Sequence, residues 1–148
     1  MKKLLIALAI SVIGLNEINA QVEYKVITSV ESIVPSGLGR SRLISATADR
    51  DFEEFTSEQS EEDQTRNKSK RKEIRVKDFE ETKLLNFYNL GGIRFQNIAS
   101  NDAIISSKIT TMISNGWELA FVTSAVESAG DKDPNGIFIT RYIFKRNK

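Results

Sequence analysis

The chain has 148 residues, with 21 basic and 20 acidic side chains, no histidine and no cysteine. Its formal net charge of +1 gives no overall attraction toward nucleic acid or an anionic membrane. The missing residue types exclude Ser-His-Asp and Cys-His nucleophile systems, disulfide bonds, and zinc or copper sites built on imidazole or thiolate within this chain.

The first residues have the three-part order of a bacterial secretory signal. Two lysines precede an apolar run from Leu4 to Leu15, and mostly polar or small residues follow it up to Ala20. The run is too short for a membrane-spanning helix, which needs about 20 residues. We therefore expect residues 1–20 to be a signal peptide, and residues 21–148 to form one exported domain, periplasmic or extracellular and not integral to the membrane.

The exported part opens on alternating apolar and charged side chains. Residues 22–26 alternate in this way, which predicts a half-buried strand that continues weakly to Val30. A proline- and glycine-rich segment at 35–39 interrupts the pattern. Leu43–Thr47 then predicts a second short strand.

A change of composition follows. Asp49–Asp63 holds eight acidic residues against Arg50, and Arg66–Lys77 holds seven basic residues against Glu73. Blocks like these rarely bury themselves, so we expect residues 49–72 to be a charged, mobile insert. The two blocks could also pair with each other as a loose arm.

The next residues predict a helix and a short extended piece. Asp78 and Glu81 fit a capping box, which favours a short helix from Phe79 to about Asn89, ended by two glycines. The apolar residues between 93 and 98 indicate a brief extended segment after it.

The clearest helix signal covers Asn101–Asn115. Polar residues at 100–102 supply candidate caps, and an apolar stripe follows at the helical spacing: Ile105, Ile109, Met112 and Ile113. Residues 117–122, with Trp117, Leu119 and Phe121 on one face, predict a strand. Residues 138–144 predict a last strand, and Asp133–Gly136 is turn chemistry that favours a hairpin between the two.

Three motifs occur in a familiar order: Val22–Ile27 (Val-Glu-Tyr-Lys-Val-Ile), Asn115–Leu119 (Asn-Gly-Trp-Glu-Leu) and Ile143–Arg146 (Ile-Phe-Lys-Arg). The pattern resembles the small bacterial domain-of-unknown-function 4177 family. That resemblance implies a Tyr-Lys-Val strand, a helix that ends in Gly-Trp-Glu-Leu and a closing strand that ends in Phe-Lys-Arg. Residues 31–100 then correspond to a long insertion. The resemblance supplies an architecture and no chemistry.

The Gly-Trp-Glu-Leu motif also has a structural interpretation from its residues alone. Gly116 ends the helix and lets the chain reverse, and Trp117 lies over the seam between helix and sheet. Glu118 faces outward by alternation, and Leu119 returns inward. We favour this structural role over a ligand role.

Carboxylates offer the remaining catalytic chemistry. The acidic pairs Glu53-Glu54, Glu61-Glu62 and Glu80-Glu81 are adjacent in sequence, so their side chains diverge on a helix or a strand. Most of them lie in the charged insert, where a solvated surface is expected. We therefore expect no enzyme activity.

One segment has the opening pattern of a calcium loop. Asp131–Gly136 matches its first six positions, but Tyr142 occupies the position of the closing glutamate, and Pro134 restricts the loop. An ordinary hairpin turn is the favoured interpretation. No metal and no cofactor is expected.

Two segments combine glycines with arginines and could hold an anion. The Gly37–Arg42 loop would offer backbone N–H donors beside Arg40 and Arg42, and Gly91–Arg94 has similar ingredients, with Arg94 as its charge. Neither matches a phosphate-loop signature, so a turn with solvated arginines is the simpler interpretation. The basic run Lys68–Lys72 has no interleaved aromatic residue, so nucleic-acid binding is not expected.

These observations predict an α+β domain, a small antiparallel sheet of three to five strands packed against one main helix, with a long charged insertion. The favoured function is a non-enzymatic envelope or secreted protein that binds a partner protein or surface. The alternative is a small anionic ligand-binding protein that uses Arg40, Arg42 and Arg94. An exposed apolar patch would favour the first, and arginines converging on a pocket would favour the second.

Overall fold

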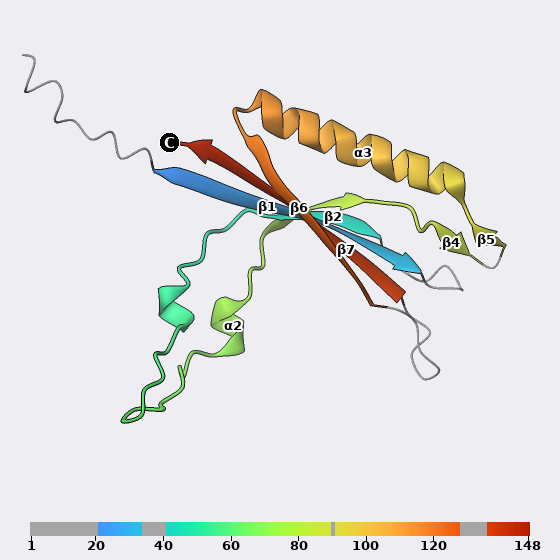
Figure 1. Cartoon of the computed structure of the whole chain (residues 1–148). Helices are drawn as coiled ribbons and strands as arrows, with labels where there is room; N and C mark the ends of the chain where they lie inside the picture. The colour runs from blue at the N-terminus through green and yellow to red at the C-terminus, as the bar shows by residue number, and fades with distance from the viewer. Residues whose placement is uncertain (1–20, 34–40, 90, 128–135) are drawn as a thin grey trace, which may run out of the picture.

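The computed structural model describes residues 21–33, 41–89, 91–127 and 136–148. They form a five-stranded antiparallel sheet in the order β3-β2-β1-β7-β6, with a long helix, α3 (Phe95–Ser114), on one side of it (Figure 1). The strands are β1 (Val22–Ile33), β2 (Arg42–Ala46), β3 (Phe79–Lys83), β6 (Glu118–Glu127) and β7 (Gly136–Asn147). This architecture confirms the predicted α+β fold class.

The centre of the sheet joins the first and the last of these strands. β1 pairs with β7 from Val22↔Asn147 to Ile33↔Gly136, and beyond the ladder the Lys148 N–H donates to the Gln21 carbonyl at 2.8 Å. β7 also pairs with β6, which confirms the predicted hairpin. Residues 131–135 of the candidate calcium loop and the leader, residues 1–20, lie outside the described residues.

The core fills the space between α3 and the sheet. Its buried side chains come from three strands, the helix and the segments next to them: Ile27, Leu43, Leu84, Ile105, Met112, Trp117 and Phe144. Phe144 is fully buried and Ile27 is 2% exposed. Burial of each such side chain contributes about 1.5–3 kcal/mol, so one helix face and one sheet face supply most of the stability.

The helix begins earlier than its sequence pattern predicts. α3 starts at Phe95 rather than at Asn101, and Asn101 is completely buried instead of capping an exposed end. Its side chain accepts a hydrogen bond from the Leu85 N–H at 2.8 Å and donates to the Leu85 carbonyl at 2.8 Å and to Glu31 Oε1 at 2.9 Å. A polar residue that resembles a cap therefore ties the helix to the chain beside it.

The predicted helix over Phe79–Asn89 is wrong. Phe79–Lys83 is strand β3, which pairs with β2 from Ala46↔Phe79 to Arg42↔Lys83. A two-stranded ribbon, β4 (Tyr88–Asn89) and β5 (Gly92–Ile93), follows it, so the extended piece expected at 93–98 is confined to Ile93. Pairing with a distant strand outweighs the local capping signal, because propensity is a weak prior beside tertiary contacts.

A β-bulge divides the side chains of β6. Leu119 pairs with Phe144, but Phe121 pairs with Ile143, so Ala120 is an extra residue between the two pairs. The bulge moves Phe121 to the opposite face from Leu119. The prediction that Trp117, Leu119 and Phe121 share one face is therefore wrong at Phe121, which is 61% exposed.

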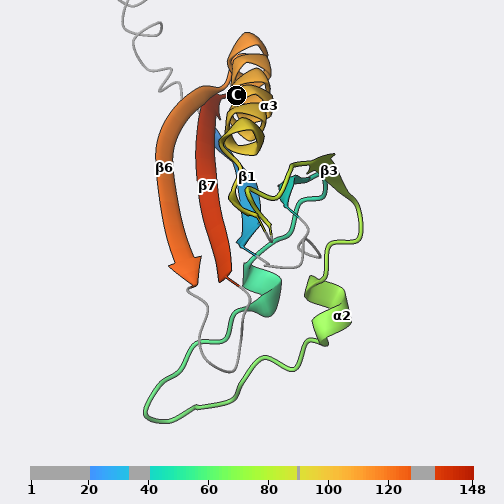
Figure 2. The same cartoon turned by 90° about the vertical axis from the view of Figure 1, so that its right-hand side faces the viewer.

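The charged insert, residues 49–72, lies in the connection between β2 and β3. It contains a short 3-10 helix, η1 (Glu53–Phe55), and the start of α2 (Arg71–Ile74). Asn67 joins the second half of the insert to the first, because its Nδ2 donates to the Glu54 and Thr56 carbonyls at 3.0 and 3.1 Å. Figure 1 shows it on the opposite side of the sheet from α3, and Figure 2 shows it as one long loop. Its mobility stays a prediction.

Candidate functional site: the uncovered face of the sheet

The sheet has one covered and one open face. Along each strand, residues that alternate with the buried ones point away from α3, since successive side chains of a strand face opposite sides. We call the side away from α3 the open face. On β1, for example, Ile27 is buried under the helix, whereas Tyr24 and Val26 lie on the open face and are 64% and 43% exposed.

An apolar row crosses the open face from one edge of the sheet to the other. On one half, Phe79 of β3 pairs with Ala46 of β2; on the other, Val26 of β1 pairs with Ile143 of β7, which pairs with Phe121 of β6. The last β1–β2 pair is Ile27↔Ser45. Val26 and Ala46 occupy the next position along this antiparallel ladder, so the two halves of the row meet. We call these five residues the apolar row.

The row and its neighbour Tyr24 leave a large apolar surface in solvent. Phe79 is 50% exposed, Phe121 61%, Val26 43% and Tyr24 64%. With about 200 Å² for each aromatic side chain, this surface is on the order of 400 Å². A patch of that size matches the largest patch of a typical monomer, which is often functional.

Two ion pairs flank the apolar row. Arg42 Nε lies 2.7 Å from Glu81 Oε1, and Lys145 Nζ lies 3.4 Å from Glu118 Oε1. Arg141 is different. It is exposed, its neighbours in register are Thr28 and Thr123, and no acidic side chain pairs with it within the described ranges. The open face therefore combines an apolar row with one arginine available to a ligand.

The sequence pattern held a signal for this face. In β7 both alternating sets are apolar: Ile139 and Ile143 on the open side, and Tyr142 and Phe144 on the covered side. A strand that is apolar on both sides is typical of a sheet covered on both faces. α3 covers one of the two faces. On the other, Val76 lines a pocket of about 240 Å³ with Ala46 and Phe79, whereas Val26 and Phe121 are 43% and 61% exposed.

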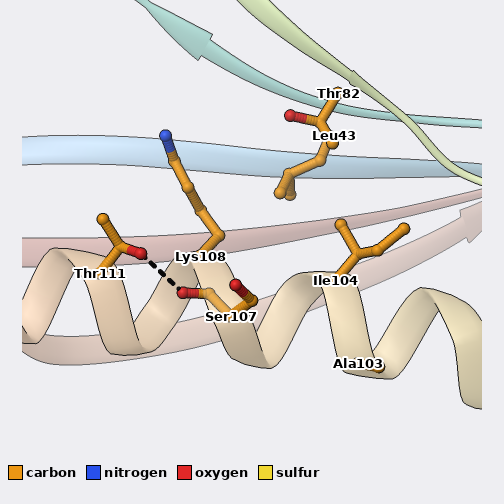
Figure 3. Close-up of a pocket in the computed structure, with 7 residues that line it drawn as sticks. All are labelled: Leu43, Thr82, Ala103, Ile104, Ser107, Lys108 and Thr111. Carbon is orange, nitrogen blue, oxygen red and sulfur yellow. Dashed lines mark hydrogen bonds between the residues drawn. The ribbon is translucent and has the colours of Figure 1, made fainter.

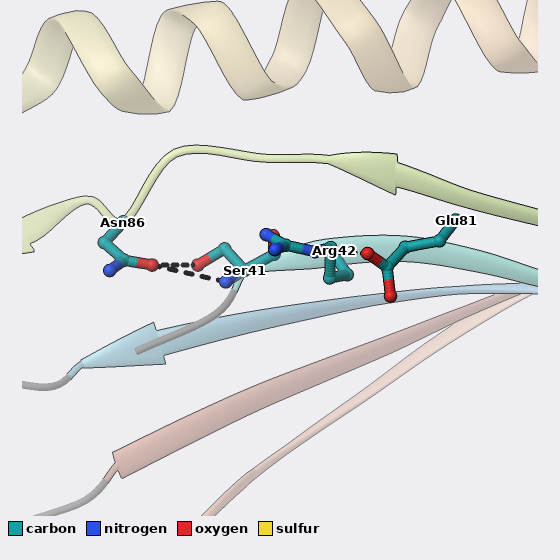
Figure 4. A network of polar contacts seen from close by, with 4 residues as sticks. All are labelled: Ser41, Arg42, Glu81 and Asn86. Carbon is teal, nitrogen blue, oxygen red and sulfur yellow. Dashed lines mark hydrogen bonds and ion pairs between the residues drawn. The ribbon is translucent and has the colours of Figure 1, made fainter. Parts of the chain in front are cut away.

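The candidate anion-binding arginines are placed differently from one another. Figure 4 shows Arg42 on β2, where its Nε donates to Glu81 and its Nη1 donates to the Ser41 carbonyl at 2.7 Å. Arg94 immediately precedes α3, on the covered side of the sheet, and its backbone N–H donates to the Phe87 carbonyl at 2.7 Å. Arg40 and residues 37–39 lie outside the described residues. Anion binding by this loop stays a prediction.

The Gly-Trp-Glu-Leu motif anchors the start of β6. Gly116 has the left-handed φ of +81°, and Trp117 is only 8% exposed. The guanidinium of Arg146 lies 4.4 Å from the Trp117 ring centre, and its Nε donates to Glu23 Oε2 at 2.9 Å. The tryptophan thus packs in the core and against one arginine. That the motif has a structural role rather than a ligand role stays a prediction.

A groove of about 510 Å³ lies between α3 and strands β2 and β3 (Figure 3). Leu43, Thr82 and Ile104 line it, and Lys108 reaches past it to Glu80 Oε2 at 2.7 Å. The hydrogen bond and charge of Lys108 lower the pKa of the Glu80 carboxyl. The groove's lysine is therefore engaged in an ion pair, and the other polar side chains that line the groove, Thr82, Ser107 and Thr111, carry hydroxyl groups.

The described ranges contain no cluster of three or more residues with carboxylate, imidazole or thiolate groups that could hold a metal ion. Among the described helices, none is long and apolar enough to cross a membrane.

Comparisons with known proteins found no relative. No family model matches the chain, and no curated protein and no solved structure matches it. The resemblance to the domain-of-unknown-function 4177 family therefore stays a prediction.

Proposed function

We propose that this chain is an exported, non-enzymatic protein of the bacterial envelope or medium that binds a partner protein through the open face of its sheet. The observation that carries the proposal is the apolar row, which crosses all five strands on the side away from α3 and leaves Val26, Phe79 and Phe121 43%, 50% and 61% exposed. Burying that surface on a partner would contribute far more than any polar contact on this face.

The chemistry of the open face defines the partner surface that it fits. Tyr24 and Phe121 offer rigid aromatic contacts, and aromatic residues and arginine are the side chains enriched at the centres of protein interfaces. Arg141 lies on β7 two residues before Ile143 of the apolar row, on the same face of the sheet. The partner is therefore expected to present an apolar surface with a carboxylate opposite Arg141.

The shape and charge of this face favour a protein over a small ligand or a lipid surface. Small ligands bind in concave pockets. A pocket of about 520 Å³ lies beside Val26 and Ala46 and one of about 240 Å³ beside Ala46 and Phe79, but the row continues past both to Ile143 and Phe121. A lipid surface of anionic headgroups attracts clusters of basic residues, but Arg42 and Lys145 are each paired with a glutamate. The small-anion alternative rests on Arg40, Arg42 and Arg94 and stays a second hypothesis.

Site-specific photo-crosslinking in cells that produce the full chain tests the proposal. A photoreactive phenylalanine at Tyr24 should cross-link one defined protein, and the same group at Thr110, exposed on α3, should not. Arg141→Glu should lower the cross-linking yield at Tyr24 by at least about tenfold, because it places two like charges opposite each other. Lys72→Glu makes the same change of net charge in the insert and should leave the yield unchanged.

Two results would contradict the proposal. Equal cross-linking from Tyr24 and Thr110 would mean that the open face is not a specific site. A cross-link from Tyr24 to a second copy of this chain would replace partner binding by self-association through this face.

A further inference from the structure

The end of β2 diverges from β1 beside a pocket. The last β1–β2 pair is Ile27↔Ser45, so residues 22–26 of β1 have β7 on one side and no described strand on the other. A pocket of about 520 Å³ lies along this stretch, between β1 and residues 46–49. Because β1 has a free edge here, side chains from both of its faces line the pocket: Tyr24 and Val26 from the open face, and Lys25 from the covered side.

The β1 wall of this pocket combines apolar surface with a positive charge. Tyr24 and Val26 are 64% and 43% exposed. Arg146, which also lines the pocket, is paired with Glu23 at 2.9 Å, whereas Lys25 forms no ion pair within the described ranges. A group that fits this wall therefore has an aromatic or aliphatic side chain with a carboxylate next to it.

The insert carries such a group close to the pocket. Its residues 51–55 read Asp-Phe-Glu-Glu-Phe. Phe52 is 72% exposed, and its neighbours Asp51 and Glu53 form no ion pair in the described part of the chain. Figures 1 and 2 show η1 on the side of the sheet away from α3, which is the side of the pocket's apolar wall. A large aromatic side chain between two carboxylates is thus placed on the same side as a wall that complements it.

Phe52 needs only a local change of the backbone to reach the pocket. Asp49 lines the pocket, and Phe52 follows it three residues later. A β-turn over residues 49–52 brings the Cα atoms of its two ends within about 7 Å, and aspartate is favoured at the first position of such a turn. The hydrogen bonds that residues 51–58 make in the described ranges stay within the insert, so this movement breaks none to the sheet.

We propose that residues 49–55 form a strap that closes over this end of the open face. In the closed strap, Phe52 packs against Tyr24 and Val26. The carboxylates on either side of Phe52 then approach Lys25. The strap and a partner protein compete for the same apolar side chains, so this inference rests on the proposed function and adds its regulation. The apparent affinity for the partner is then proportional to the fraction of chains whose strap is open.

Photo-crosslinking within protein purified after expression of the full chain tests the closure without any partner. A photoreactive phenylalanine at Phe52 should attach to residues 22–26 of the same chain, with a yield that does not change on dilution. The same group at Ile74, an apolar residue of α2 that is 48% exposed, should attach there at least about tenfold less, because no single turn brings it to the pocket.

A change of charge gives a second readout of the closure. Lys25→Glu should lower the yield from Phe52 about threefold, since it replaces an attraction by a repulsion at a partly exposed site. Lys70→Glu makes the same change of charge in the second half of the insert and should leave the yield unchanged.

The regulatory role is measured in cells, with the photoreactive group at Phe121, at the β6 end of the apolar row. Phe52→Ser removes the anchor of the strap and should raise the yield of the partner cross-link at Phe121 at least about threefold. Phe52 is mostly exposed, so this variant should keep the thermal stability of the parent. Ile74→Ser is the matched control and should leave the yield unchanged.

The outcomes separate this inference from the proposed function. No cross-link from Phe52 to residues 22–26, or one that disappears on dilution and so comes from a second copy, would overturn the strap. An equal partner yield at Phe121 with and without the Phe52 side chain would overturn its regulatory role and leave partner binding intact. If Phe121 cross-links no defined protein in either chain, the proposed function fails and the regulatory role with it, whereas the cross-link from Phe52 still decides whether the strap closes.

Discussion

Replacing Asn101 by alanine removes the polar contact that holds α3 to the chain after β3. The side chain is completely buried and makes three hydrogen bonds, two with the backbone of Leu85 and one with Glu31. Each such bond contributes about 1 kcal/mol net, and the Leu85 groups lose their partner as well. Asn101→Ala should therefore lower the free energy of unfolding by about 2–4 kcal/mol, a large share of the roughly 5–15 kcal/mol of a small domain.

Urea unfolding followed by circular dichroism measures the effect, with Asp102→Ala as the control. Asp102 is the next residue of α3 and is exposed, so its replacement should change stability by less than about 0.5 kcal/mol. Asn101→Asp keeps the shape and the bond from the Leu85 N–H. It loses both donated bonds and places a carboxylate beside Glu31, so it should destabilise at least as much as alanine. A loss below about 1 kcal/mol for Asn101→Ala would refute the role assigned to this side chain.

Four further outcomes are expected. Gly116→Ala should lower stability by about 1 kcal/mol in thermal melts, because a left-handed φ of +81° disfavours any side chain although nothing lies within 4 Å of the added Cβ; Gly116→Asn should cost less. Lys108 lowers the pKa of Glu80 in the folded chain. The stability that this carboxylate contributes is therefore present above the ordinary carboxyl pKa, and is lost as pH falls from there through the lowered pKa of the folded chain. Lys108→Met should remove this pH dependence, which amounts to less than about 1 kcal/mol for a partly exposed pair; unchanged acid sensitivity would contradict the assignment. Replacing residues 49–72 with a short Gly/Ser linker should preserve cooperative unfolding, and loss of cooperativity would show that the insert is structural. Intact-mass analysis of exported protein should show Gln21 as the first residue; retention of the leader would contradict the predicted cut.

Local patterns predicted those strands whose side chains carry a clear signal. Alternation in β1 and the apolar runs of β6 and β7 reflect burial that each strand experiences along its own length. β3 has no such signal, because all of its side chains are exposed and its only apolar residue is Phe79. It is a strand because β2 offers an unpaired edge, and a distant partner leaves no trace in the local sequence.

The start of α3 was missed for a related reason. Asn101 resembles a helix cap in sequence, since polar residues with short side chains favour that position. In the structure it lies inside the helix, where the backbone of Leu85 provides the partners that satisfy its amide. Asparagine can be either a capping residue or a buried polar residue, and only the chain segment packed against it distinguishes the two roles.

The sequence predicted what kind of surface would bind a partner, but not where on the fold it lies. An exposed apolar patch was expected to mark partner binding, but its location depends on which face α3 covers, and on the bulge at Ala120 that moves Phe121 to the open side. Neither can be read from periodicity. Arg141 was not singled out, because a lone arginine within a strand has no sequence motif.

The central β1–β7 pair has a consequence for the order in which the protein can fold. Val22 is paired with Asn147, so the middle of the sheet joins the first and the last parts of the domain to leave a ribosome or a secretion channel. Until β7 emerges, β1 has neither its main partner nor the buried Phe144 to pack on, and contacts of such long sequence separation form slowly. A chain exported as proposed above would thus lack the centre of its sheet until β7 had passed through the channel.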